Sequence, residues 1–103
     1  MSKRSKACEI SQKTKETVWI RDNRSCFICG KSVPKTCANA HYVKRSQGGL
    51  GIEQNIVTMC PYCHYEEDFG QNTKLYEEKM KNYLKSIYGD NWNIENLIYK
   101  KYN

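Results

Sequence analysis

The chain has 103 residues, 27% of them charged, and a net charge of +6. This length fits one compact domain, and small, polar domains often need a disulfide or a bound metal in addition to their core. No stretch is apolar enough to span a membrane, and no apolar run follows the basic N-terminal residues as it would in a secretory signal. We therefore expect no membrane association and a cytoplasmic setting, in which cysteines stay reduced.

The excess positive charge lies in the first third of the chain. Residues 1–35 carry nine Lys and Arg against three Asp and Glu, whereas residues 36–103 carry eight of each. A basic segment suits binding to a polyanion such as nucleic acid, and an ordinary solvated surface explains it equally well. We expect residues 1–10 to form a flexible basic arm and residues 11–103 to form a single domain.

The first half of the domain is predicted to contain one helix and two short strands. The helix spans about residues 12–22, with Ser11 as a suitable N-cap residue and Val18 on its apolar face. Residues 39–43 and 56–59 are β-prone, and a Ser-Gln-Gly-Gly turn lies between them.

The second half is predicted to be helical. One helix begins at Pro61 and ends at Gly70, because proline suits the first helical turn and glycine ends helices. Thr73 caps a longer helix to about Tyr88, whose apolar residues recur at steps of three and four and indicate core packing. A final short helix is expected over about residues 91–101.

Four of the six cysteines form two Cys-x-x-Cys pairs, Cys26 with Cys29 and Cys60 with Cys63. Zinc prefers four tetrahedral sulfur ligands, and this spacing lets both thiols of a pair face one ion. In a reducing compartment such pairs indicate a structural zinc site rather than disulfides. The other two, Cys8 and Cys37, are expected to be unligated, with Cys37 as the alternative ligand in a three-plus-one arrangement.

The two histidines of the chain lie close to these cysteines. His41 falls in the first β-prone segment, Asn55 precedes the second, and His64 lies in the helix that begins with proline. Asp68 lies one helical turn beyond His64, where an imidazole and a carboxylate can hold a divalent ion together. A lone histidine is more often structural, and Asp68 beside two glutamates suits a solvated surface. The joint order favours a metal site with open positions for water and phosphate.

This region resembles the HNH endonucleases of the His-Me finger, or ββα-metal, class in their four-cysteine zinc form. The resemblance covers roughly residues 16–70. It rests on the blocks Ala-His-Tyr-Val, Gly-Gly, Asn-Ile-Val-Thr-Met-Cys and Cys-His, at residues 40–43, 48–49, 55–60 and 63–64. It implies a small α+β fold, with a ββα-metal core and zinc knuckle over residues 26–70 and C-terminal helices over residues 73–101. Similar small proteins occur in phages and prophages, some of them encoded beside DNA-packaging genes.

The resemblance implies a role for each site residue. His41 would be the general base that takes a proton from the attacking water. Asn55 would fix the loop and orient the His41 ring through a hydrogen bond. His64 and Asp68 would bind the catalytic Mg²⁺, Mn²⁺ or another divalent ion. The reaction would be hydrolysis of DNA phosphodiester bonds to 5′-phosphate and 3′-hydroxyl ends.

Two further features bear on activity. Lys44 and Arg45 follow the base and would contact DNA phosphates, although an ordinary polar strand end is the alternative for both. Family members often carry Asp or His just before the base as another metal ligand, where this chain has Ala40. With two protein ligands left, we expect weak metal binding that the DNA phosphate completes.

Other functions remain open. A zinc-stabilised module without catalytic activity would bind nucleic acid or a phage packaging (terminase) protein, and a purely structural four-thiol knuckle would leave His64 as a spare ligand. The expected partner is DNA in a bacterial or phage-infected cell. The expected oligomeric state is a monomer or a weak dimer.

Overall fold

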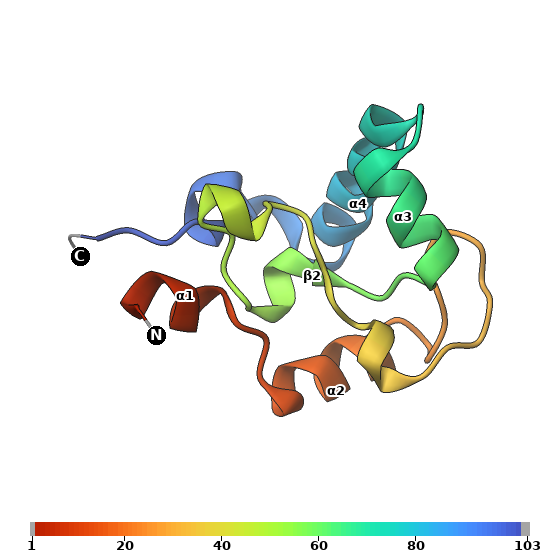
Figure 1. The fold of residues 1–103 in the computed structure, drawn as a ribbon, viewed down its shortest axis with the longest axis horizontal. Helices are drawn as coiled ribbons and strands as arrows, with labels where there is room; N and C mark the ends of the chain where they lie inside the picture. The colour runs from red at the N-terminus through yellow and green to blue at the C-terminus, as the bar shows by residue number, and fades with distance from the viewer. Residues whose placement is uncertain (1, 102–103) are drawn as a thin grey trace.

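The computed structural model describes residues 2–101, so Met1 of the expected arm and residues 102–103 of the expected domain lie outside the described residues. The α-helices are α1 (Lys3–Cys8), α2 (Gln12–Arg21), α3 (Pro61–Phe69) and α4 (Thr73–Tyr88), and the strands are β1 (Ala40–His41) and β2 (Ile56–Val57) (Figure 1). Short 3-10 turns are η1 (Lys35–Cys37), η2 (Arg45–Gln47), η3 (Glu53–Asn55), η4 (Gly89–Asn91) and η5 (Ile94–Leu97). The predicted α+β class is confirmed.

Strands β1 and β2 form a buried two-stranded antiparallel sheet. Ala40 lies opposite Val57, and His41 lies opposite Ile56. The strands are shorter than predicted because the backbone beyond them bonds to side chains instead of a neighbouring strand. The Val43 N–H and carbonyl bond to Asn55, and the Thr58 N–H bonds to Asp22. The sheet is therefore a short platform that presents His41.

Helix α3 follows β2 and packs beside α4 (Figure 1). The predicted ends of α3 are confirmed, with Pro61 in its first turn and Gly70 as its C-cap. The predicted cap of α4 is wrong: Asn72 is the N-cap residue, and the Thr73 hydroxyl donates a hydrogen bond to the Gly70 carbonyl. The main core gathers between the strands and these helices, and its buried members include Val57, Met59, Met80, Leu84, Trp92 and Leu97.

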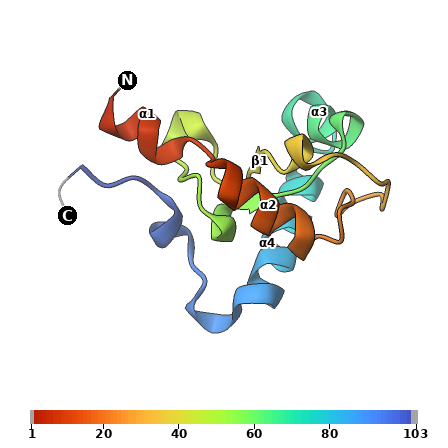
Figure 2. The same ribbon diagram turned by 90° about the horizontal axis from the view of Figure 1, so that it is seen from below.

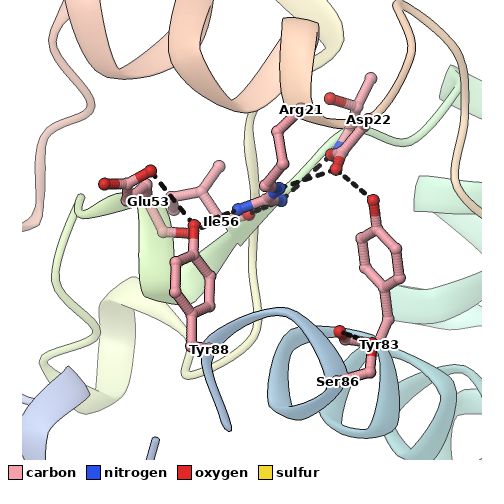
Figure 3. A network of polar contacts seen from close by, with 8 residues as sticks. Arg21, Asp22, Glu53, Ile56, Tyr83, Ser86 and Tyr88 are labelled. Carbon is pink, nitrogen blue, oxygen red and sulfur yellow. Dashed lines mark hydrogen bonds and ion pairs between the residues drawn. The ribbon is translucent and has the colours of Figure 1, made fainter.

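A polar network ties the end of α2 to β2 and α4 (Figure 3). The carboxylate of Asp22 is 5% exposed and accepts hydrogen bonds from Arg21, from the backbone N–H of Thr58 and from the Tyr83 hydroxyl. Arg21 also donates to the carbonyl of Ile56 at 2.7 Å. Burial and the bond to Asp22 raise the pKa of Tyr83 to about 12. These bonds satisfy polar groups that would otherwise be costly to bury.

The flexible arm expected at the N-terminus instead contains helix α1. Ala7 accepts a hydrogen bond from the Gly51 N–H at 3.0 Å, and Arg4 donates to the Ser46 carbonyl at 2.9 Å. Cys8 is buried at the end of the helix. Figure 2 shows α1 beside η2. The sequence pattern missed this helix because it is short and is held by contacts with a distant turn.

The helix expected over residues 91–101 is also wrong, because the chain there forms the single 3-10 turn η5. After this turn Ile98 forms an isolated antiparallel bridge with Gly49. A side chain at Gly49 is excluded, since its Cβ would lie 1.7 Å from the Val43 carbonyl oxygen. None of the helices in the described part of the chain is long and apolar enough to cross a membrane.

Candidate functional site

The thiols of the two Cys-x-x-Cys pairs meet in one cluster, formed by Cys26, Cys29, Cys60 and Cys63. All four sulfur atoms lie within 4.8 Å of one another, and those of Cys29 and Cys60 are 3.7 Å apart. A tetrahedral ion with Zn–S bonds of about 2.3 Å holds its sulfur ligands about 3.8 Å apart. All six cysteines lie within the described residues, and none of them forms a disulfide. The cluster therefore fits a metal ion in size and ligand type.

Local backbone structure positions these thiols. In the first pair, the Gly30 N–H bonds to the Cys26 carbonyl, and Gly30 adopts a φ of 78° that a tight thiol-bearing turn requires. In the second pair, Cys60 is the N-cap of α3, and its sulfur accepts a hydrogen bond from the Cys63 N–H at 3.4 Å. A helix N-terminus favours negative charge, so it stabilises the thiolate form that metal binding needs.

The electrostatics of the cluster call for a cation. Burial and the neighbouring sulfur atoms of Cys60 and Cys26 raise the pKa of the Cys63 thiol. Thiols crowded in this way ionise together only when a positive ion lies among them. Cys8 and Cys37 lie outside this group.

His41 lies on β1 with 7% of its surface exposed. Its Nε2 atom is 2.9 Å from the backbone carbonyl of Cys8 at the end of α1. A carbonyl only accepts hydrogen bonds, so Nε2 carries a proton, and Nδ1 holds the free lone pair of the neutral ring. The ring lines a cavity of about 350 Å³, together with Asn39, Lys15 and Arg45.

The surroundings of His41 favour its neutral form. Burial lowers the pKa of His41, the hydrogen bond to Cys8 opposes this shift, and the charges of Arg45 and Lys44 lower the pKa further. A neutral imidazole with one free nitrogen is a suitable proton acceptor near pH 7.

Asn55 is fully buried and holds the loop that follows His41. Its side-chain oxygen accepts a hydrogen bond from the Val43 N–H at 2.8 Å, and its amide donates to the carbonyls of Val43 and Leu50 at 3.1 and 2.9 Å. These bonds connect Asn55 to both ends of the loop between Val43 and Leu50. The expected hydrogen bond to the ring is wrong, because the ring is held by Cys8 instead.

His64 and Asp68 lie one turn apart on α3, as their spacing predicts. Their Nε2 and Oδ2 atoms are 3.6 Å apart, which is too long for a hydrogen bond and suits two ligands of one ion at about 2.1 Å each. Burial lowers the pKa of His64, so its ring is available as a neutral ligand. Both residues line a second cavity, of about 290 Å³.

Glu67 is a site residue that the sequence pattern missed. It is fully buried. One of its carboxylate oxygens, a ring nitrogen of His64 and a carboxylate oxygen of Asp68 all lie within 4.8 Å of one another. In the sequence it is one of the two glutamates beside Asp68, for which a solvated surface was the alternative explanation. The usable signal was its spacing of four from Cys63, which puts it on the buried face of α3.

The two basic residues after His41 have different surroundings. Lys44 forms ion pairs with Glu67 and, at 2.8 Å, with Asp68, so its ammonium is held by carboxylates. Arg45 is exposed and lines the His41 cavity, where its guanidinium is 3.5 Å from the Ser5 carbonyl.

Asn39 lines the cavities of both histidines. This residue was also missed, although it precedes His41 by two positions and so lies on the same side of the strand. The arrangement brings a neutral imidazole with a free nitrogen close to a histidine–carboxylate pair that can hold a divalent ion.

Residues 26–69 match the family model described as HNH endonuclease. The match includes both cysteine pairs together with His41, Asn55 and His64. No curated protein and no solved structure matches the chain.

Proposed function

We propose, from the membership of residues 26–69 in the HNH endonuclease family, that the protein is a metal-dependent DNA endonuclease. The observation that carries this proposal is that one residue, Asn39, lines both histidine cavities. His41, whose Nδ1 has a free lone pair, lines one cavity, and His64 and Asp68, with ligand atoms 3.6 Å apart, line the other. A base and a cation on adjacent sides of one phosphodiester are what hydrolysis by water needs.

Two metals with different roles fit the two donor sets. The four thiols would hold a structural Zn²⁺, because soft sulfur ligands in a closed tetrahedron select zinc. His64 and Asp68 would hold Mg²⁺, Mn²⁺ or another divalent ion, which when bound stabilises negative charge on the phosphate and on the leaving 3′ oxygen. Hydrolysis would then leave 5′-phosphate and 3′-hydroxyl ends.

The protein's own groups do the remaining work. His41 accepts the water proton at Nδ1, while the Cys8 carbonyl keeps the ring oriented through Nε2. Lys15 and Arg45 line the same cavity and supply positive charge for the DNA backbone. The net charge of +6 favours the approach of a polyanion.

A plasmid cleavage assay with zinc-loaded protein and added Mg²⁺ or Mn²⁺ tests this function. We expect the wild type to cut and His41→Ala to cut more slowly by roughly 10²–10⁴-fold, the usual contribution of a general base. Nicks that DNA ligase seals without prior phosphorylation would identify the expected end groups. Equal cutting by wild type and His41→Ala would reject His41 as the base.

A second function, nucleic-acid binding without cleavage, is favoured by one observation. Ala40 is fully buried in the core, so the position before His41 supplies no metal ligand. This function predicts DNA binding, no cleavage with any divalent ion, and unchanged binding by His41→Ala. A phage packaging protein would be a further partner only on this reading.

A further inference from the structure

Lys44 lies in a place where a surface lysine is not expected. Its ammonium bonds to Asp68 Oδ1 at 2.8 Å and, more closely, to Glu67 Oε2. The Lys44 side chain is 29% exposed, and the Glu67 side chain is fully buried. Burial lowers the pKa of Lys44, but its hydrogen bonds to the two carboxylates outweigh that effect and raise the pKa, so the ammonium stays charged.

The carboxylates that bind Lys44 also belong to the group that can bind a divalent ion. Asp68 directs one oxygen to Lys44 and the other toward His64. Glu67 bonds to Lys44 through one oxygen, and its other oxygen is buried without a hydrogen-bond partner among the described residues. An ion held by His64 and Asp68 would thus share a carboxylate with the ammonium.

Two cations bound to one carboxylate repel each other strongly, because their separation is only a few ångströms and the site is partly shielded from water. With Lys44 in place, the charges of Lys44 and Asp68 cancel when His64 is neutral. Without Lys44 the Asp68 carboxylate leaves a charge of −1, which is the better match for a divalent ion.

We propose that Lys44 is the resident counterion of the His64–Glu67–Asp68 group and that a divalent ion binds by displacing its ammonium. The inference rests on the proposed function, since it takes His64 and Asp68 as the divalent-ion site. A lysine suits this exchange because its charge sits on a flexible four-carbon stem. Metal affinity in the free protein is then limited by Lys44 as well as by the small number of ligands.

The competing explanation is that Lys44 only neutralises the buried Glu67. Removing Lys44 alone would leave that carboxylate buried and unpaired, which is strongly destabilising. The test is therefore made in a Glu67→Gln background, where the buried charge is absent and Asp68 still pairs with Lys44.

The experiment measures Mn²⁺ binding to zinc-loaded, full-length protein through the electron paramagnetic resonance signal of free Mn²⁺. We expect Lys44→Met/Glu67→Gln to bind Mn²⁺ at least about tenfold more tightly than Glu67→Gln, from the loss of a neighbouring charge. The matched control, Arg45→Gln/Glu67→Gln, removes a charge one residue away and is expected to change the affinity by less than about threefold. Adding His64→Ala should remove the gain. Melting curves establish that each variant is folded, and Lys44→Gln/Glu67→Gln replaces the methionine variant if that one is not.

Equal or weaker binding by the Lys44 variant overturns this inference alone. A gain of the same size in the Arg45 control also overturns it, because the effect would then be one of overall charge. Absence of Mn²⁺ binding in every variant and in the wild type overturns the divalent-ion site and, with it, the inference.

Discussion

The four-thiol cluster and the His64–Glu67–Asp68 group both involve helix α3 but differ in construction. Helix α3 carries Cys63 of the cluster and all three residues of the acidic group, whereas Cys26 and Cys29 come from the turn after α2. The cluster has four identical ligand types, with all sulfur atoms within 4.8 Å of one another. The acidic group has mixed ligand types; His64 and Asp68 line a cavity, and Lys44 forms ion pairs with both carboxylates. A closed ligand shell stabilises a fold, whereas an open and partly neutralised one can exchange an ion and admit a substrate.

The largest expected effect comes from breaking the closed site. Cys60→Ala removes a thiol that is both a cluster ligand and the N-cap of α3. Because binding of structural zinc contributes directly to the free energy of folding, we expect loss of zinc and of cooperative melting, measured by metal analysis and circular dichroism. Cys37→Ala, outside the cluster, is the control and should keep both. A normal melting curve for Cys60→Ala would contradict a structural role.

The next effect separates the two sites. His64→Ala should abolish Mn²⁺ binding and reduce plasmid cleavage by about 10²-fold or more, while zinc content and melting temperature stay close to those of the wild type. The physical reason is that the ring belongs to the His64–Glu67–Asp68 group and is no part of the thiol cluster. If zinc were lost together with Mn²⁺, the two sites would not be independent.

A smaller effect tests the scaffold between the two sites. Asn55→Ala would leave the polar groups of Val43 and Leu50 without their partner in a buried environment. We expect the free energy of unfolding to fall by about 3 kcal/mol or more, as estimated from three backbone groups that lose their partner, with cleavage reduced through displacement of the loop. Urea unfolding measures the change. A loss of activity at full stability would show instead that Asn55 touches the substrate.

The smallest expected effect is a shift in the pH dependence of the cleavage rate and of stability. Because burial lowers the pKa of His41, the acid limb of the cleavage rate should fall below pH 6.5, the ordinary value for histidine.

His64 has a lowered pKa as well, so the unfolded chain binds more protons than the folded one below that pH. Stability should therefore decrease as the pH falls through 6.5 and below, and the decrease should be absent from a His41→Ala/His64→Ala variant. A rate limb above pH 6.5 would show that the ring is not shielded in this way.

Much of the fold and the site could be predicted from local patterns. The helix over residues 12–22 and the helix between Pro61 and Gly70 follow from caps and breakers that act over a few residues, and both are present. The thiol pairs were equally predictable, since a spacing of two residues sets the geometry of each half-site. The two segments whose secondary structure was wrongly predicted lie near the ends of the chain, where α1 and η5 owe their conformations to contacts with the turn at residues 48–51.

Local sequence patterns were enough to predict the candidate site residues: the four paired thiols, the order of His41, Asn55 and His64, and the one-turn spacing from His64 to Asp68. Ligand type and short-range spacing are properties of the local chain, so no tertiary information was needed. Three features depend on the folded chain: the Cys8 carbonyl lies against His41, Glu67 is buried, and Lys44 pairs with it. These partners are 23 or more residues apart, and packing, which no local pattern encodes, determines which distant polar groups must satisfy one another.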